Sequence, residues 1–359
     1  MDNATLLWAH LGILTRQRYQ ALLDVYETLA DAAKHLGPEL LESLGCKQET
    51  IERVLPLIED FNAEKLQAIL TKQNILMLAI DDHRYPKRLL ETVSAPVFLY
   101  IKGDLNILSE PSLALVGTRR MSTYGRRVTE AFVEPIVRAG MITVSGLAGG
   151  VDTIVAEETL KAGGKTIAVV AHGLQMIFPP ANAKLAEDIV KHGGVVLSEE
   201  ALGTPPDMHL FPKRNRVIAG LSMGTIVLEA PEGSGALITA RAALDESRDV
   251  FIVPGQIFDP QYAGSHKFLS TGGAKLVTSA QDVLQEYGVQ SITTDEQAPA
   301  SNFVASNDLE AAVYNALTVM PQPVDDLVTR SKRAPSEIGS ALTMLELSGA
   351  AKNVGNGLW

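Results

Sequence analysis

The chain has 359 residues, of which 46% are hydrophobic and 20% are charged. This length suits two or three domains, and the composition excludes a disordered chain. The single cysteine, Cys46, excludes an intrachain disulfide framework and a zinc cluster built on cysteines. The net charge of −11 argues against a nucleic-acid partner for the chain as a whole. However, residues 112–220 hold 12 basic and 10 acidic residues, whereas the remaining segments are neutral or acidic.

The first 80 residues predict a small helical domain. Apolar residues recur there at helical spacing, for example Leu22, Tyr26, Leu29 and Ala33, and short turns separate the runs. The acidic start lacks the basic region of a signal peptide, and the apolar run 141–156 is broken by glycines and Asp152. We therefore expect a cytoplasmic protein with no membrane insertion.

Residues 81–288 alternate between short apolar runs and amphipathic stretches. The runs 112–118, 141–147, 165–173, 194–200, 225–230 and 249–255 predict strands, and the stretches between them predict helices. Strands that are apolar on both faces and alternate with helices are typical of a parallel sheet covered on both sides. The predicted fold class is α/β, a Rossmann-like doubly wound and mostly parallel sheet.

The C-terminal part predicts a separate domain. Residues 289–307 are polar and without periodicity, so we expect a linker there. Residues 308–359 contain three helical stretches followed by KNVGNGLW, which predicts a short hairpin. Three helices and a hairpin are typical of a winged-helix domain, a relative of the helix-turn-helix.

Loops that follow the predicted strands carry the candidate chemistry. Ligands of open parallel sheets bind at the carboxyl ends of the strands. Here these ends carry VGTRRMSTYG, SGLAGGVD, AHGLQMIFPPAN, SEEALGTPPDMHLFPKRNR and EAPEGSGALITAR. A glycine after a strand is often only a tight turn, but five such loops at one edge, two with clustered cations, favour a phosphate-binding site.

The stretch LFPKRNRVIAGLS, residues 210–222, sets three cations before an apolar run. Charged residues in such a position usually form the solvated first turn of an amphipathic helix. Cations are nevertheless poorly suited to a helix N-terminus, where the free N–H groups prefer anions. Lys213, Arg214 and Arg216 therefore predict a negatively charged partner, although Arg216 can equally lie along the helix and pair with an acid.

Motifs of catalysis are absent from the sequence. GTRRMS does not fit the dinucleotide fingerprint, no Walker lysine follows either glycine loop, and no metal-ligand spacing or G-x-S-x-G elbow occurs. His172 as a base and Asp152 as an acid are the candidates, but a loop-filling histidine and a helix-capping or first-turn acid are the better interpretations. We therefore expect no catalytic residue, no metal site and no cofactor.

The motifs VGTRR, SGLAGGVD, FPPAN, LGTPP, FPKRNRVIAGLS, SGALITARAAL and DVFIVPG stand in this order over residues 105–275. In these motifs the chain resembles the DNA processing protein A family (DprA, also called Smf). The segment YPKRLLETVSAPVFLYIKGD before the sheet, the helical start and the winged-helix end also fit the family's layout.

The resemblance implies a binding protein and not an enzyme. Family members bind single-stranded DNA during natural transformation, protect it, load a RecA-type recombinase on it, and dimerise through the Rossmann-like domain. Carried over to this sequence, the DNA-binding residues are Gly117, Thr118, Arg119, Ser145, Gly146, Phe211, Lys213, Arg214 and Asn215. Arginines and backbone N–H groups would fix phosphates, and Phe211 would stack on bases without sequence preference.

The chain departs from the family pattern at several positions. Gly149 and Gly233 stand where basic residues are usual, Ala156 replaces a histidine, and His266 replaces an asparagine, with Glu232 beside Gly233. Lost cations predict weaker binding of phosphates and a smaller dependence on salt.

Neither terminal domain carries a clear sign of DNA contact. The recognition-like stretch APSEIGSALTMLEL holds no cation, so we expect a protein contact or a structural role there. The N-terminal part resembles a SAM-like or helix-hairpin-helix unit without its glycine hairpin.

Two other functions are alternatives to the binding of single-stranded DNA. The rival is a nucleotide-processing enzyme of the related phosphoribohydrolase-like group, because EAPEGSGALITA faintly resembles its phosphate loop. The P-G-G-x-G-T-x-x-E arrangement of that group is not reproduced. The other alternative is an interaction scaffold whose DNA groove has lost its cations.

Overall fold

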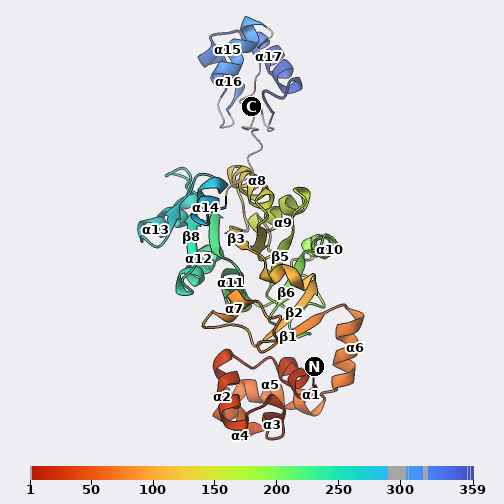
Figure 1. Ribbon diagram of the computed structural model, residues 1–359. Helices are drawn as coiled ribbons and strands as arrows, with labels where there is room; N and C mark the ends of the chain where they lie inside the picture. The colour runs from red at the N-terminus through yellow and green to blue at the C-terminus, as the bar shows by residue number, and fades with distance from the viewer. Residues whose placement is uncertain (1, 290–304, 306, 318–321, 354, 356) are drawn as a thin grey trace. The chain divides into compact units, whose positions relative to one another are not determined.

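The computed structural model describes residues 2–289, 305, 307–317, 322–353, 355 and 357–359 (Figure 1). The chain divides into two compact units, Met1–Ile292 and Thr293–Trp359. Among the described residues, no helix is both long enough and apolar enough to span a lipid bilayer.

Six helices form the N-terminal part of the first unit. They are α1 (Asn3–Leu11), α2 (Arg16–Tyr26), α3 (Leu29–Ala33), α4 (Pro38–Ser43), α5 (Gln48–Glu59) and α6 (Ala63–Lys72). Side chains at their N-termini, such as Asp2, Thr15 and Asn62, accept hydrogen bonds from the first free N–H groups. Trp8 is fully buried at their centre, and the Tyr100 hydroxyl of the sheet donates to Ala9 O over 3.0 Å.

A nine-stranded sheet forms the rest of the first unit. Its strands are β1 (Leu76–Ala79), β2 (Phe98–Gly103), β3 (Ser112–Gly117), β4 (Ile142–Ser145), β5 (Thr166–Val170), β6 (Val195–Ser198), β7 (Gly224–Glu229), β8 (Asp249–Ile252) and β9 (Lys275–Leu276). The order across the sheet is β1-β2-β6-β5-β4-β3-β7-β8-β9. The seven strands β3 to β9 are parallel to one another. Strands β1 and β2 are added antiparallel at the edge next to β6.

Helices cover both faces of the sheet. Within the α/β part they are α7 (Lys87–Leu90), α8 (Thr123–Arg138), α9 (Val151–Lys161), α10 (Ala183–Lys191), α11 (Leu210–Leu221), α12 (Gly235–Asp245), α13 (Ala263–Ser270) and α14 (Ala280–Glu286). Three short 3-10 helices, η1 (Leu105–Ser109), η2 (Pro180–Asn182) and η3 (Pro260–Tyr262), lie in the loops.

Strand β3 shows why the sheet needs a layer of helices on each of its two faces. Leu113 and Leu115 belong to a core shared with α8, α9 and α14, whereas Ala114 and Val116 belong to the larger core shared with α11 and α12. Successive side chains of a strand point to opposite faces, so a strand that is apolar throughout needs a helix layer on each side.

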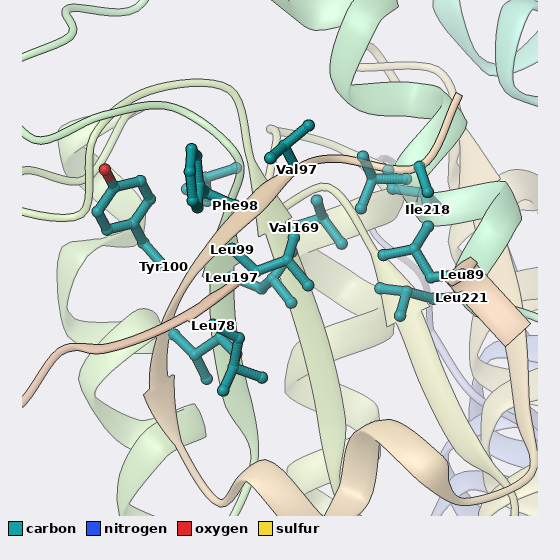
Figure 2. Close-up of a cluster of buried hydrophobic side chains, with 14 of the residues drawn as sticks. Leu78, Leu89, Val97, Phe98, Leu99, Tyr100, Val169, Leu197, Ile218 and Leu221 are labelled. Carbon is teal, nitrogen blue, oxygen red and sulfur yellow. The ribbon is translucent and has the colours of Figure 1, made fainter. Parts of the chain in front are cut away.

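The larger core continues from the sheet into the N-terminal helices. Figure 2 shows part of it, with Leu78 of β1, Leu99 of β2, Val169 of β5, Leu197 of β6 and Ile218 of α11 in one cluster. Trp8 and Leu22 belong to the same continuous core. The helical part and the sheet are therefore packed as one unit, although the sequence predicts two domains that meet near residue 80.

The second unit is a three-helix domain with its own core. Its helices are α15 (Asp308–Ala316), α16 (Val324–Ser331) and α17 (Pro335–Leu347). Val313, Leu327, Ile338 and Leu345 are buried between them. Leu358 pairs with Pro323 and Gly355, and these bridges supply the described part of the wing.

The sequence predicts the α/β alternation correctly. All six predicted strands of 112–255 and the helices between them are present, with bounds shifted by a few residues. The predicted boundary at residue 80 places β1 with the helices, whereas β1 pairs with β2 in the sheet. The predicted linker 289–307 falls almost wholly outside the described residues.

Truncation of Leu99 tests the continuity of the core. Leu99 is fully buried, so Leu99→Ala should lower the free energy of unfolding by about 2–5 kcal/mol through the lost contacts and the remaining cavity. Urea denaturation followed by circular dichroism would measure it. Val93→Ala is the control, since Val93 is 82% exposed and should cost no more than about 0.5 kcal/mol. Equal midpoints for the two variants would contradict this assignment.

Candidate nucleic-acid interface

The topology creates a crevice at the carboxyl edge of the sheet. The chain proceeds from β3 outward to β6 and then returns to place β7 on the other side of β3. The helices that follow these two strands, α8 after β3 and α12 after β7, pack into different cores on opposite faces of the sheet, so the loops after β3 and β7 diverge. A pocket of 580 Å³ opens there, lined by residues 116–120, Ala148, Asp152, residues of α11, residues 231–236, Ile238, Thr239, Pro260 and Gln261.

The loop after β3 forms one wall and depends on close backbone packing. A Cβ on Gly117 would lie 2.5 Å from Val151 Cγ2, and a Cβ on Gly150 would lie 2.3 Å from Thr118 O. Gly150 also has a φ of +76°, which a side chain would strain. Thr118 is buried, and its Oγ1 accepts from Arg120 N over 3.1 Å. These contacts hold the side chains of Arg119 and Arg120 at the surface.

Arg214 of α11 is buried beneath the pocket. Its guanidinium donates to Gly146 O over 2.6 Å, to Val169 O, and to Asn215 Oδ1 over 3.1 Å. Burial lowers the pKa of Arg214 to about 10, so the group stays charged at neutral pH. Arg214 thus joins α11 to the ends of β4 and β5, and its charge acts from the floor of the pocket.

Asp152, in the first turn of α9, supplies the opposite charge. Its Oδ2 accepts from Gly146 N over 3.1 Å and from Ala148 N over 3.3 Å. Burial raises the pKa of the Asp152 carboxyl, and the charge of Arg214 and these N–H groups oppose that rise. A Cβ on Gly146 would lie 2.5 Å from Arg214 Nη2 and 2.6 Å from Asp152 Oδ2. Gly146 is therefore required by this buried pair.

Lys213 and Arg216 are paired with acids of their own chain. Lys213 Nζ lies 2.7 Å from Glu200 Oε1 and 3.7 Å from Glu199 Oε1, and Arg216 donates to Glu199 Oε2. Of the two alternatives for Arg216, the ion pair is confirmed. Anions from the loop after β6 thus compensate the cations near the start of α11, which begins without a side-chain cap.

Arg119, Phe211 and Phe178 form a platform at the rim, in which Arg119 and Phe178 are exposed and Phe211 is half-buried. The Arg119 guanidinium carbon lies 4.6 Å from the centre of the Phe211 ring, a cation–π contact. The rings of Phe211 and Phe178 are 6.4 Å apart, and Phe178 is 42% exposed. No salt bridge among the described residues involves Arg119 or Arg120, so both charges are available to an anion.

The pocket brings together six of the nine predicted DNA-binding residues. They are Gly117, Thr118, Arg119, Phe211, Arg214 and Asn215. Gly146 lies directly behind, against Arg214. Ser145 is buried, and its hydroxyl donates to Leu115 O over 2.8 Å, while Lys213 lies outside the pocket with Glu200. Asn215 donates to Gly235 O over 3.1 Å and so joins α11 to the start of α12.

The sequence did not single out two parts of the lining. The first is Ser234–Ala236 at the start of α12. These residues belong to the Gly-Ser-Gly loop after β7, which in the sequence is only one of five glycine-containing loops that follow strands. The second is η3, which has no phosphate-binding motif and reaches the pocket only because β8 lies next to β7.

The departures from the family pattern change the rim. A Cβ on Gly149 would lie 3.9 Å from Arg119 O, an ordinary van der Waals contact, so the backbone leaves room for a side chain there. Gly233 has a φ of +74°, which favours glycine. Glu232 lines the pocket and pairs with Lys267 over 3.2 Å. This part of the rim is therefore acidic or neutral.

The two candidate catalytic side chains have structural partners. His172 Nδ1 lies 3.0 Å from Gly173 O, its Nε2 accepts from Phe178 N over 3.1 Å, and burial lowers its pKa. A neutral histidine that donates at one nitrogen and accepts at the other fits both contacts. Asp152 is held as described above. Within the described part of the chain, no group of three His, Cys, Asp or Glu side chains could hold a metal ion.

The first unit is therefore a Rossmann-like α/β domain with a glycine-lined, cationic pocket at its topological switch point, followed by a winged-helix domain. A family model described as DNA recombination-mediator protein A matches residues 76–288, and a model of the DprA winged-helix domain matches residues 295–357. The chain belongs to the DNA processing protein A (DprA/Smf) family.

Individual relatives agree with this membership. The DNA processing protein DprA of Streptococcus pneumoniae is 40% identical over 276 residues, which cover 76% of this chain and 94% of the relative. Protein Smf of Escherichia coli is 34% identical, covering 88% and 85%. The solved structure of S. pneumoniae DprA has a TM-score of 0.66 and 36% identity, covering 80% of this chain and 98% of that one.

A further solved structure concerns the DNA binding of a relative. It describes the single-stranded DNA binding mode of DNA processing protein A from Helicobacter pylori. Its TM-score is 0.54 and its identity 28%, covering 59% of this chain and 95% of that one.

Substitution of Arg214 tests its structural role. Arg214→Met removes the donor for Gly146 O and Val169 O and leaves the charge of Asp152 without its partner, so we expect a loss of about 3–5 kcal/mol in unfolding free energy. Lys213→Met, one residue away, removes an ion pair whose lysine is 42% exposed, and Arg216 still pairs with Glu199, so the loss should be smaller, on the order of 1 kcal/mol. Urea midpoints of both variants measure the difference; a wild-type midpoint for Arg214→Met would disprove the role.

Proposed function

We propose that this protein binds single-stranded DNA during natural transformation, protects the incoming strand and loads a RecA-type recombinase on it. The observation that carries the proposal is the pairing of two unneutralised arginines with an exposed aromatic platform at the switch-point pocket. Membership of the DprA/Smf family and the single-stranded DNA binding mode described for the H. pylori relative support it.

The pocket suits a single strand for a physical reason. Arg119 and Arg120, which line the pocket from the loop after β3, provide donors for phosphates. Phe211 and Phe178 provide faces on which unpaired bases stack, and every base has such a face. The strand is therefore recognised without sequence preference. Thr118, Ser145, Gly146, Arg214 and Asn215 support these groups from behind.

We further propose that the function is binding and not catalysis. The candidates for acid–base chemistry, Asp152 and His172, already hold the loops of the pocket through their hydrogen bonds. We place the protein in the cytoplasm, where incoming strands and the recombinase meet. A homodimer formed through the α/β unit completes the proposal. Half-buried Leu237 of α12, which lies outside the DNA pocket beside Phe268 of α13, offers it an apolar contact.

We propose a protein contact for the winged-helix domain. Helix α16 exposes two acidic side chains, Asp325 and Asp326. Helix α17 exposes two large apolar side chains, Met344 and Leu347. No lysine or arginine lies within α17, so a polyanion would find little attraction there.

Removal of Arg119 and Arg120 tests the DNA-binding site. The double variant Arg119→Ala/Arg120→Ala should bind a labelled oligo-dT at least about tenfold more weakly at low salt, because hydrogen bonds to charged groups are lost. Each lost phosphate contact should also reduce the slope of log K against log salt by about 0.7, or about 1.4 for both. Fluorescence anisotropy across a salt series measures both quantities.

The matched control is Arg53→Ala/Arg138→Ala, which removes two exposed arginines outside the pocket. It should leave affinity and slope unchanged. The two double variants are also compared in the loading of a RecA-type recombinase on DNA coated with a single-strand-binding protein. Absence of oligo-dT binding by the wild type at low salt would rule out the proposed function.

Release of Lys213 from Glu200 tests whether the internal ion pair limits binding. Glu200→Gln removes the nearer of the two carboxylates around Lys213 Nζ, at 2.7 Å, and leaves Glu199 at 3.7 Å, so this cation at the edge of the interface is less neutralised. We expect oligo-dT to bind up to about fivefold more tightly, since an exposed ion pair contributes at most about 1 kcal/mol, with a steeper salt slope. Glu187→Gln on α10 is the control for lost negative charge. Equal gains in both variants would show a general charge effect only.

A further inference from the structure

Two consecutive apolar side chains are exposed in the turn after β8. Ile257 is 79% exposed and Phe258 is 91% exposed, which makes Phe258 the most exposed large hydrophobic residue among those that the structure describes. Neither side chain packs into either core of the first unit. An exposed aromatic at the tip of a short turn has a cost in solvation, and the packing of the described residues gives no reason for it.

The turn itself is firmly held. A Cβ on Gly255 would lie 2.1 Å from the ring of the buried Tyr262, so the backbone lies directly on that ring. Asp259 N donates to Gln256 O over 3.0 Å, and Asp259 Oδ1 accepts from Gln261 N over 2.9 Å. His266 Nε2 lies 3.2 Å from Gly255 O. Phe258 is therefore presented to solvent by a fixed backbone and not by a loose loop.

The turn leads directly into the wall of the DNA pocket. Pro260 and Gln261, two and three residues after Phe258, line the pocket together with Arg119 and Phe211. The loops that carry them follow different strands. Arg119 follows β3, whereas the turn follows β8, and only β7 lies between these strands. Two strand spacings are roughly 10 Å, so the turn flanks the pocket on the side away from β3.

We propose that Phe258, together with Ile257, is a second stacking surface for the bases of the bound strand. This inference rests on the proposed function, because it concerns the same pocket and the same ligand. The strand would pass from the Phe178–Phe211 platform, across the arginines of the β3 loop, to the turn after β8. The ligand class is a single-stranded nucleic acid whose bases are unpaired on both sides of the pocket.

The chemistry of this surface favours bases over a protein partner. Two side chains expose a few hundred Å² at most, since an aromatic side chain buries 150–250 Å². A stable protein interface needs about 800 Å² per partner. The same small apolar area is sufficient for one or two bases, and the phosphates that accompany them find Arg119 and Arg120 in the pocket.

The test measures binding of fluorescein-labelled oligo-dT by the full chain. Phe258→Ala should weaken binding at least about fivefold, the lower end of the effect of one lost base–aromatic stack. Its salt slope should equal that of the wild type, because no cation is removed. Phe258→Trp should restore the affinity and report stacking directly through quenching of its fluorescence on addition of unlabelled oligo-dT.

Val25→Ala and Val25→Trp are the controls, since Val25 is 70% exposed on α2, far along the chain from the pocket residues. They should show unchanged affinity and no quenching. If the wild type binds and Phe258→Ala binds equally well, the inference is wrong while the proposed function stands. If Phe258→Ala instead changes the oligomeric state in sedimentation velocity, the surface is a protein contact and the inference is also wrong. Failure of the wild type to bind would overturn both.

Discussion

The buried guanidinium of Arg214 is the interaction on which the interface depends. It joins α11 to the carboxyl ends of β4 and β5 and stands opposite the carboxylate of Asp152 at the start of α9. A charge in this position is costly to desolvate, so it persists only because carbonyls and an opposite charge surround it. The glycine at position 146 follows from the same packing, since its missing side chain leaves the room that both charged groups occupy.

The residues that hold the loops of the pocket in place are different from those that can contact a ligand. One set of residues is buried and fixes the geometry of the loops, and a second set is exposed and free to meet a ligand. Arg214 and Asn215 belong to the first set, although they stand beside Lys213 in the sequence. Arg119 and Phe211 belong to the second set, and they come from elements on different sides of the switch point. A rigid first set is what allows a shallow pocket to hold a flexible strand with few contacts.

The balance of charge shows how an acidic protein can present a cationic site. Glu199 and Glu200 neutralise Lys213 and Arg216 within the chain, and Glu232 lies on the opposite rim. The exposed cations that line the pocket are therefore Arg119 and Arg120, both in the loop after β3. Binding to such a site relies on a small number of phosphate contacts and on stacking, which favours a single strand over a duplex.

The sequence by itself determined the α/β alternation, the winged-helix unit and the glycine loops at one edge of the sheet. These follow from local periodicity and from the rule that parallel strands end on the same side. Six of the nine residues that it nominated for DNA binding lie among those that line the pocket. The sequence could not separate Arg214 from Lys213, because neighbours on a helix point in different directions and their burial depends on what packs against each face. It could not show that η3 and Phe258 flank the pocket, since strand order decides that. Tertiary structure alone set these features, because charge pairing across the sheet and the return of β7 beside β3 join residues that are far apart in the chain.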